Sequence, residues 1–149
     1  MRGRHIAALA ACASLFGATA CGSSSSAAEG GPIAVTLQEF AVVPGATSAP
    51  AGSVTFEISN TGPNDVHEFV VMKTDLAIDA LPTAADGSVD EAGEGLEPID
   101  EVEDIAVGAS ETLTVDLEAG SYVLICNIYD EDENEAHYQE GMRVGFTVT

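Results

Sequence analysis

The chain has 149 residues and a formal net charge of −21, with 25 acidic residues against four basic ones. This length suits one domain of ordinary size. The charge excludes a nucleic-acid partner, because almost no side chain is available to neutralise phosphates. It favours a basic protein or a cation as a partner, and adaptation to high salt is a second, purely compositional explanation.

The first 20 residues have the pattern of a signal peptide. Arg2 and Arg4 give a basic start, the apolar stretch 6–18 follows, and small residues come next. The apolar stretch is too short to span a membrane. We therefore expect the domain that follows to be exported.

Cys21 comes directly after these small residues and resembles the lipid-acceptor cysteine of bacterial lipoproteins. Residues 22–31, GSSSSAAEGG, are typical of a flexible polar tether. We expect Cys21 to be acylated, so that residues 21–31 anchor the domain to the outer face of the bacterial cytoplasmic membrane. Cleavage that releases a freely secreted protein is the alternative.

The pattern of residues 32–149 predicts one domain built from β-strands. Short runs that are rich in β-branched residues, or that alternate between apolar and polar ones, are separated by turn signals. The run 121–128 is almost entirely apolar, which predicts a central strand buried on both faces. Strands of this length joined by such turns predict an all-β sandwich. The six predicted strands are 33–40, 53–60, 65–74, 111–117, 121–128 and 142–149.

The segment 76–110 breaks this pattern, since it is long, acidic and rich in glycine. A segment of this length without regular structure is uncommon inside a compact domain. We interpret it as a long acidic insertion that makes a solvated excursion on one side of the sandwich. It would contain a short helix or an extra strand at about 101–107. Its sequence indicates no function.

Few nitrogen or sulfur donors are left once the leader is removed. The histidines are then His67 and His137, and Cys126 is the one free thiol if Cys21 is acylated. A lone thiol in an oxidising compartment is either buried as a small apolar residue or kept for a purpose such as metal binding.

Four donors occur in an order that suits a metal site. His67 lies on a predicted strand, Cys126 ends the central strand, His137 follows a loop, and Met142 begins the last strand. Two imidazole nitrogens, a thiolate and a weak thioether suit copper that alternates between Cu(I) and Cu(II). Each residue alone also has an ordinary explanation, as a surface histidine, a buried cysteine or a core methionine.

These residues resemble the pattern of the cupredoxins, the small blue copper proteins such as plastocyanin and azurin. The first histidine follows a turn in NTGPNDVHEF, and the other donors have the spacing C-x10-H-x4-M. Over residues 32–149 the resemblance implies a Greek-key β-sandwich with one copper ion per chain. It implies that the copper ligands are His67, Cys126, His137 and Met142. It also implies that His137 forms the solvent-facing edge for electron transfer.

Two neighbours of these residues are candidates for contact with the site, and the first differs from the usual family pattern. Glu68 follows the first histidine, where asparagine is common, and Asn127 follows the cysteine. We expect both side chains to lie next to the site, where the negative charge of Glu68 would favour Cu(II).

The stretch between the cysteine and the second histidine carries five acidic residues. Asp130, Asp132 and Asn134 have the spacing of the first ligands of a calcium loop. Glu135 and Gly141 then occupy positions where such a loop needs a glycine and a glutamate. A solvated acidic loop is the simpler interpretation, and a loose calcium contact is the alternative.

The resemblance implies a monomeric, extracytoplasmic electron carrier that is tethered to the membrane and exchanges single electrons with redox proteins. The acidic surface implies a basic docking surface on the partner. The alternatives are a copper delivery or storage module and a copper-free adhesion or scaffold domain. An enzyme is not expected, since both histidines of the exported domain are assigned to copper. None is left for further copper sites or for a Ser/His/Asp triad.

Overall fold

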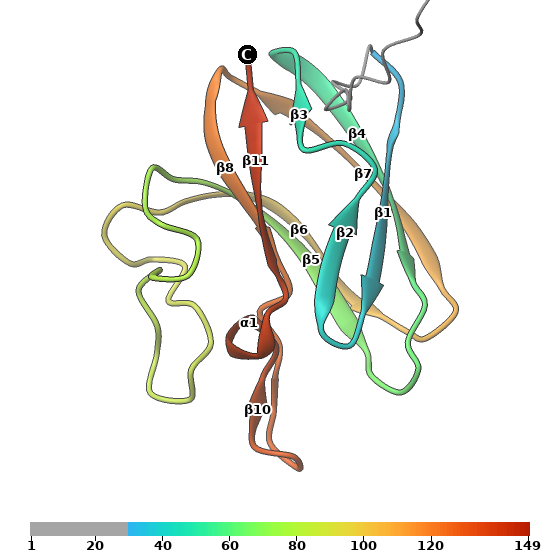
Figure 1. Cartoon of the computed structure of the whole chain (residues 1–149), viewed down its shortest axis with the longest axis vertical. Helices are drawn as coiled ribbons and strands as arrows, with labels where there is room; N and C mark the ends of the chain where they lie inside the picture. The colour runs from blue at the N-terminus through green and yellow to red at the C-terminus, as the bar shows by residue number, and fades with distance from the viewer. Residues whose placement is uncertain (1–29) are drawn as a thin grey trace, which may run out of the picture.

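Two β-sheets packed face to face make up residues 30–149, the part of the chain that the computed structural model describes (Figure 1). This arrangement confirms the predicted all-β Greek-key sandwich. The predicted signal peptide, Cys21 and the tether up to residue 29 lie outside the described residues. Within residues 30–149, no helix is both long and apolar enough to cross a membrane.

The first sheet has four strands, in the order β2 (Ala41–Pro44), β1 (Ile33–Gln38), β4 (Gly52–Asn60) and β7 (Ser110–Leu117). The second sheet has five, in the order β3 (Ser48–Ala49), β11 (Arg143–Val148), β8 (Gly120–Ile125), β5 (His67–Lys73) and β6 (Glu97–Ile105). Both sheets are mixed, because β1 pairs with β4 and β3 with β11 in parallel. A small hairpin, β9 (Tyr129–Asp130) and β10 (Glu135–Ala136), precedes the short helix α1 (His137–Glu140).

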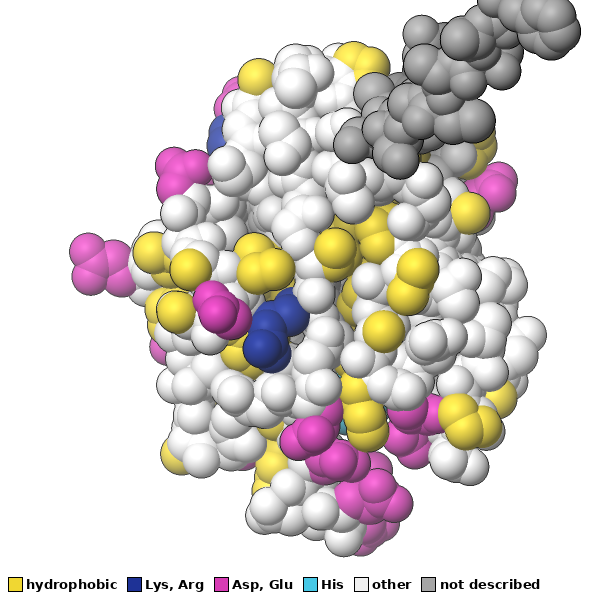
Figure 2. All heavy atoms as spheres, viewed as in Figure 1, with side chains coloured by type: hydrophobic (Ala, Val, Ile, Leu, Met, Phe, Trp, Pro, Cys, Tyr) yellow, Lys and Arg dark blue, Asp and Glu magenta, His cyan; other side chains and the backbone are white. Residues whose placement is uncertain are grey.

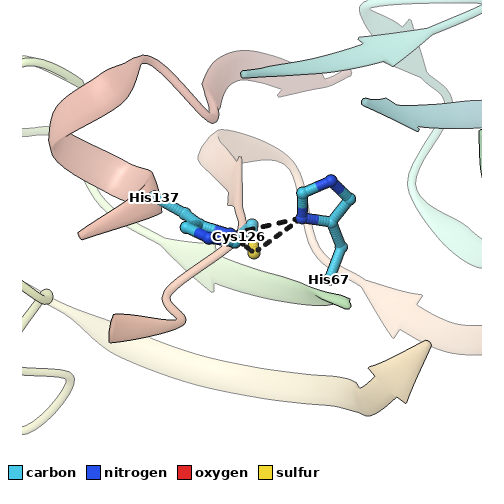
Figure 3. A group of neighbouring side chains, drawn as sticks. All are labelled: His67, Cys126 and His137. Carbon is cyan, nitrogen blue, oxygen red and sulfur yellow. Dashed lines mark hydrogen bonds between the residues drawn. The ribbon is translucent and has the colours of Figure 1, made fainter. Parts of the chain in front are cut away.

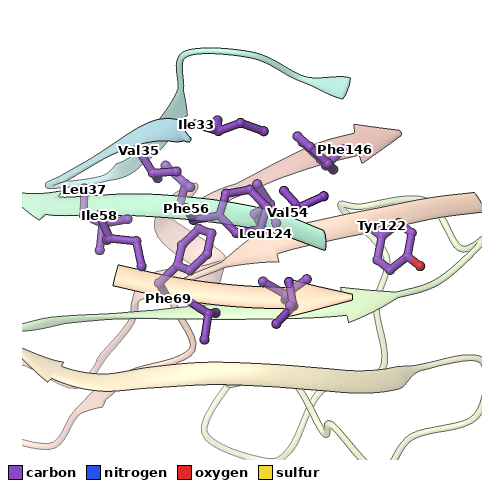
Figure 4. Packing of buried hydrophobic residues seen from close by; sticks show 14 of the residues in the cluster. Ile33, Val35, Leu37, Val54, Phe56, Ile58, Phe69, Tyr122, Leu124 and Phe146 are labelled. Atoms are coloured by element: carbon purple, nitrogen blue, oxygen red, sulfur yellow. The ribbon is translucent and has the colours of Figure 1, made fainter. Parts of the chain in front are cut away.

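Alternating residues of the two sheets form the core between them. Along β4 and β7, buried residues largely alternate with more exposed ones, as expected for strands with one solvated face. The ring of Phe56 on β4 lies 5.2 Å from that of Phe69 and 5.6 Å from that of Phe146, both on the opposite sheet (Figure 4). Inclined aromatic contacts of this kind fix the position of one sheet against the other.

Strands β5 and β8 are buried on both faces, as predicted for the run 121–128. One face belongs to the core between the sheets, and the other forms a second, smaller cluster. Leu81, Val89 and Tyr138 cover that outer face, where they pack against Val70, Met72, Val123 and Ile125.

The segment 76–110 is more structured than predicted. Its second half contains β6, a nine-residue edge strand that pairs with β5. This is the extra strand expected at about 101–107, and it begins earlier. Its first half covers the outer face of the second sheet with Leu81 and Val89. Most of the segment is exposed, as expected for a solvated excursion. Leu81 and Val89 are nevertheless buried, because the outer face of β5 and β8 is apolar and needs a cover, and Ile105 is buried in the core between the sheets. That the segment is an insertion stays a prediction.

Candidate metal centre

His67, Cys126 and His137 come together at one end of the sandwich, from three different elements. His67 is the first residue of β5, Cys126 directly follows β8, and His137 is the first residue of α1. His67 is two residues from Phe69 and Cys126 two residues from Leu124, and both of these point into the core. Since side chains along a strand alternate between faces, the two strands turn both donors to the same inner side.

The three donor atoms form a small triangle (Figure 3). The two Nδ1 atoms of His67 and His137 are 3.2 Å apart, and Cys126 Sγ lies 3.3 Å from His137 Nδ1 and 3.8 Å from His67 Nδ1. A point equidistant from atoms at these separations lies about 2.0 Å from each, close to the usual distance between a metal ion and nitrogen or sulfur ligands. The donor set therefore fits a soft ion such as copper.

Burial sets the protonation of these donors. His67 and Cys126 have no exposed surface, and His137 is 2% exposed. Burial raises the pKa of the Cys126 thiol to about 12 and lowers the pKa of both imidazoles from their ordinary value. At neutral pH the imidazoles are neutral and offer lone pairs, whereas the thiol must lose its proton to bind a metal.

The burial of His137 shows that the predicted solvent-facing edge is wrong. The physical reason is an aromatic contact that the sequence did not suggest. The ring of Phe40, from the turn between β1 and β2, packs edge-on against the imidazole with 5.3 Å between ring centroids. Any electron exchange at this end of the molecule therefore has to pass a covered imidazole.

Met142 directly precedes β11 and lies beside Cys126. The N–H of Cys126 donates to the Met142 carbonyl at 3.1 Å, and the N–H of Met142 donates to the His137 carbonyl at 3.0 Å. The Met142 side chain is fully buried, in the same core cluster as Cys126. The structure thus brings all four predicted residues to one end of the sandwich, with three donor atoms in the triangle and Met142 placed by its backbone contacts.

Glu68 and Asn127 lie next to the cysteine, as predicted. The N–H of Glu68 donates to Cys126 Sγ at 3.4 Å, and the N–H of Asn127 donates to Glu68 Oε1 at 2.7 Å. Burial raises the pKa of Glu68 to about 7, against the lowering effect of the Asn127 N–H. The Asn127 side chain accepts the N–H of Val89 and donates to the Val89 carbonyl and to Glu91. It therefore holds the loop before β6 against the cysteine.

Asn60 shapes the loop that leads from β4 into His67. Its buried side chain donates to the carbonyls of Asp65 and Ile105, each at 2.8 Å, and accepts the N–H of Gly62 at 2.8 Å. Gly62 has φ of 65°, a left-handed conformation that glycine adopts readily. The asparagine and the glycine of the NTG motif thus carry the chain from the first sheet into the second.

The turn between β1 and β2 contributes two contacts that the sequence did not suggest. Phe40 touches His137, and the Glu39 carboxylate lies 3.9 Å from His67 Nε2. Glu39 and Phe40 are common residue types that match no motif and lie far from both histidines in the sequence. The fold alone brings them to the site.

The acidic stretch 130–135 is a hairpin rather than an irregular loop. Asp130 Oδ1 accepts the N–H groups of Asp132 and Glu133, and Asn134 has φ of 55°. These residues therefore build their own turn. In the described part of the chain, His67, Cys126 and His137 are the one group of three or more His, Cys, Asp or Glu side chains whose donor atoms lie close enough together to hold a metal ion. The acidic side chains of the hairpin do not form such a group, and the loose calcium contact stays a prediction.

A β-sandwich in which two imidazoles and a thiol converge at one end is the architecture of small copper proteins. Residues 6–137 match the model of the cupredoxin-like domain, and the chain belongs to this family. It is a copper protein with one copper ion per chain. The match ends at His137, so Met142 lies beyond it.

Solved structures of blue copper proteins have the same fold. The reduced auracyanin of the photosynthetic bacterium Roseiflexus castenholzii is 25% identical, with 83% of this chain and 99% of that chain covered and a TM-score of 0.59. Auracyanin A of Chloroflexus aurantiacus is 22% identical, with 80% and 100% covered and a TM-score of 0.51. Rusticyanin of Thiobacillus ferrooxidans is 17% identical, with 79% and 76% covered and a TM-score of 0.51. No curated protein matches the chain.

Proposed function

We propose that the protein is a monomeric, extracytoplasmic electron carrier in which His67, Cys126, His137 and Met142 bind the copper ion. The observation that carries this proposal is the triangle of two Nδ1 atoms and one Sγ atom inside a closed core. Bound copper supplies exchange of single electrons between Cu(I) and Cu(II).

The residues around the donors would hold them still while the charge of the site changes. Cys126 is fixed on one side by its N–H bond to the Met142 carbonyl and on the other by the Glu68 N–H at its sulfur. The imidazole of His137 rests on Phe40. Donors that are locked by packing and by hydrogen bonds rearrange little, and a small rearrangement favours rapid electron exchange.

The acidic end of the molecule is the proposed docking surface for a basic redox protein. Acidic side chains gather at the end of the molecule where the β9–β10 hairpin lies (Figure 2). Opposite charge on a partner would orient it towards this end before contact. The acidic residues of the hairpin are Asp130, Glu131, Asp132, Glu133 and Glu135.

A lipid anchor at Cys21 is part of the same proposal. It is supported by the signal-peptide pattern of residues 1–20 and by the polar tether 22–31. Membrane fractionation of the bacterial host tests it, since Cys21→Ala should move the protein from the membrane fraction to the soluble exported fraction. An unchanged distribution would favour the secreted form.

Addition of Cu(II) to residues 22–149 tests the electron-carrier proposal. We expect one copper ion per chain, intense visible absorption from sulfur-to-copper charge transfer, and reversible voltammetry. Cys126→Ser should abolish the absorption, because Cys126 is the one thiol of this fragment. A colourless complex with an ordinary Cu(II) EPR spectrum would contradict the proposal. Coloured copper without reversible voltammetry would favour a storage module.

A further inference from the structure

Two buried polar atoms in neighbouring side chains next to the copper site have no hydrogen-bond partner. Among the described residues, they are His67 Nε2 and Glu39 Oε2. His67 Nε2 lies 3.9 Å from the other carboxylate oxygen, Glu39 Oε1, and the Glu39 side chain is only 10% exposed. Buried polar atoms without a partner destabilise a fold. One hydrogen bond between the two side chains would satisfy both atoms.

The Glu39 carboxylate is held in place by contacts that do not involve the histidine. Its Oε1 atom accepts the N–H groups of Asn64 at 2.9 Å and Asp65 at 2.6 Å. These bonds tie the β1–β2 turn to the loop that precedes His67. They occupy Oε1 and leave Oε2 without a partner.

The tautomer of the His67 imidazole determines whether Glu39 Oε2 can accept a hydrogen bond from it. A neutral imidazole carries one N–H, on either Nδ1 or Nε2. The Nδ1 atom of His67 points into the donor triangle (Figure 3), so it must keep its lone pair to bind copper. The proton then lies on Nε2, which is buried and needs an acceptor. A metal-bound histidine usually donates its other N–H to a carboxylate or carbonyl, which orients the ring and fixes its tautomer.

We propose that Glu39 is a positioning residue, whose carboxylate accepts a hydrogen bond from His67 Nε2–H and thereby holds Nδ1 ready for copper. The Oε1 atom lies 3.9 Å from Nε2, beyond hydrogen-bond distance, so the proposal requires the carboxylate to turn Oε2 towards Nε2 when that nitrogen carries the proton. The inference rests on the proposed copper site. It adds a negative charge on the far side of one ligand, where that charge favours Cu(II).

Glu39→Gln is the variant that separates this role from a structural one. The amide oxygen of glutamine can keep the two bonds from Asn64 and Asp65, and the NH2 group then takes the place of Oε2. An N–H donor would face Nε2, so His67 should change to the tautomer with its proton on Nδ1. A structural role limited to the two backbone bonds would leave the tautomer unchanged.

Nitrogen-15 NMR of the metal-free protein at about pH 8 reads the tautomer directly. We expect His67 to carry its proton on Nε2 in the wild type and on Nδ1 in Glu39→Gln. Cu(II) affinity should fall roughly tenfold or more in the variant, the usual cost of losing such a partner. Glu57→Gln removes the same charge from an exposed position of the first sheet. It should change neither quantity.

An unprotonated Nε2 in the wild type would overturn the proposal, even if the variant failed to fold. So would an unchanged tautomer in Glu39→Gln, or a Cu(II) affinity within about twofold of the wild type. Wild-type protein that binds Cu(II) without the charge-transfer absorption would refute the electron-carrier proposal instead. The tautomer comparison alone would then decide the role of Glu39.

Discussion

At the scale of the residue, the Cys126 thiol is the donor whose proton must leave when copper binds. Burial raises its pKa to about 12, while the lowered pKa of His67 and His137 leaves both imidazoles neutral at pH 7. Between pH 7 and 8, each Cu(II) ion should therefore release about one proton, and apparent affinity should rise about tenfold per pH unit.

Calorimetry in buffers with different ionisation enthalpies measures that release. The affinity should rise with pH because the folded, metal-free protein keeps the proton on the Cys126 sulfur throughout this range. A higher pH makes the removal of that proton easier. Below the pH at which the imidazoles become protonated, affinity should fall more steeply. A release near zero would mean that the sulfur is not a ligand, and a release near three would mean that both histidines start protonated.

Met142 is the proposed ligand whose sulfur is not part of the triangle of His67, Cys126 and His137 donor atoms. Met142→Leu keeps the side-chain volume and the three strong donors, so copper should still bind. Cu(I) needs fewer ligands than Cu(II), so loss of the thioether should raise the midpoint potential measured by voltammetry. Met72→Leu is the matched control, because Met72 is equally buried but packs in the outer cluster. Equal potentials in the two variants would remove Met142 from the ligand set.

At the scale of the element, the loop from β4 to β5 depends on one buried amide. Asn60→Ala removes three hydrogen bonds and leaves the carbonyls of Asp65 and Ile105 without this donor. The free energy of unfolding should fall by about 3 kcal/mol, as measured by urea denaturation. Cu(II) affinity should fall too, because this loop places His67.

Ser59→Ala on the same strand is the control for that experiment. Its hydroxyl hydrogen-bonds to Ser110 at an exposed position, so its loss should reduce the free energy of unfolding by less than about 1 kcal/mol. Similar losses in both variants would show that Asn60 contributes no more than an ordinary surface contact.

Tyr138 of α1 holds the segment that contains Leu81 and Val89 against the outer face of the second sheet. The buried hydroxyl donates to the Ile78 carbonyl at 2.9 Å and accepts the N–H of Leu81 at 3.2 Å. Tyr138→Phe should reduce the free energy of unfolding by about 1–2 kcal/mol and speed hydrogen exchange at the Leu81 amide. Tyr129→Phe loses a bond to Asn134 in the exposed hairpin and should leave that amide unaffected. Unchanged exchange in Tyr138→Phe would contradict this role.

Elements with strong alternation were predictable from the sequence, and elements defined by distant partners were not. The run around Phe56 alternates clearly, and the strand was placed to within a residue of β4. Strand β3 has two residues and exists because Ser48 and Ala49 pair in parallel with β11. No local pattern marks such a pairing.

The same distinction applies to the site. Histidine and cysteine are so rare in this chain that their order alone pointed to the proposed ligands. Glu39 and Phe40 are ordinary residues in a turn, and only the packing of β1 against the rest of the fold brings them to the imidazoles. For the same reason, the sequence could not predict that Phe40 covers His137.

At the scale of the whole molecule, a net charge of −21 should give salt two opposite effects. Salt screens the mutual repulsion of the acidic residues, so the urea midpoint should rise between about 10 mM and 0.5 M NaCl. The rate of association with a basic redox protein should fall over the same range, because salt also screens the attraction. Stopped-flow kinetics measures the second effect.

The place of docking can be separated from the total charge by two double variants. Glu131→Gln with Glu133→Gln removes charge from the hairpin, and Glu57→Gln with Asp116→Asn removes the same amount from the exposed face of the first sheet. The hairpin pair should slow association with the basic partner more than the sheet pair. Equal slowing would mean that the partner responds to the net charge and not to this end.

The direction of β1 determines how far the copper site stands from the proposed anchor at Cys21. The strand is six residues long, about 20 Å, and it runs from the end where the described chain begins to the Glu39–Phe40 turn beside the imidazoles (Figure 1). With the proposed anchor at Cys21, the tether 22–31 adds a mean reach of roughly 17 Å. The end of the domain that holds the proposed copper ligands would then lie tens of ångströms from the bilayer surface. A redox partner whose electron-transfer centre lies level with the lipid headgroups would be too far away for electron transfer. We therefore expect a partner whose centre projects to the same distance from the membrane as the copper site.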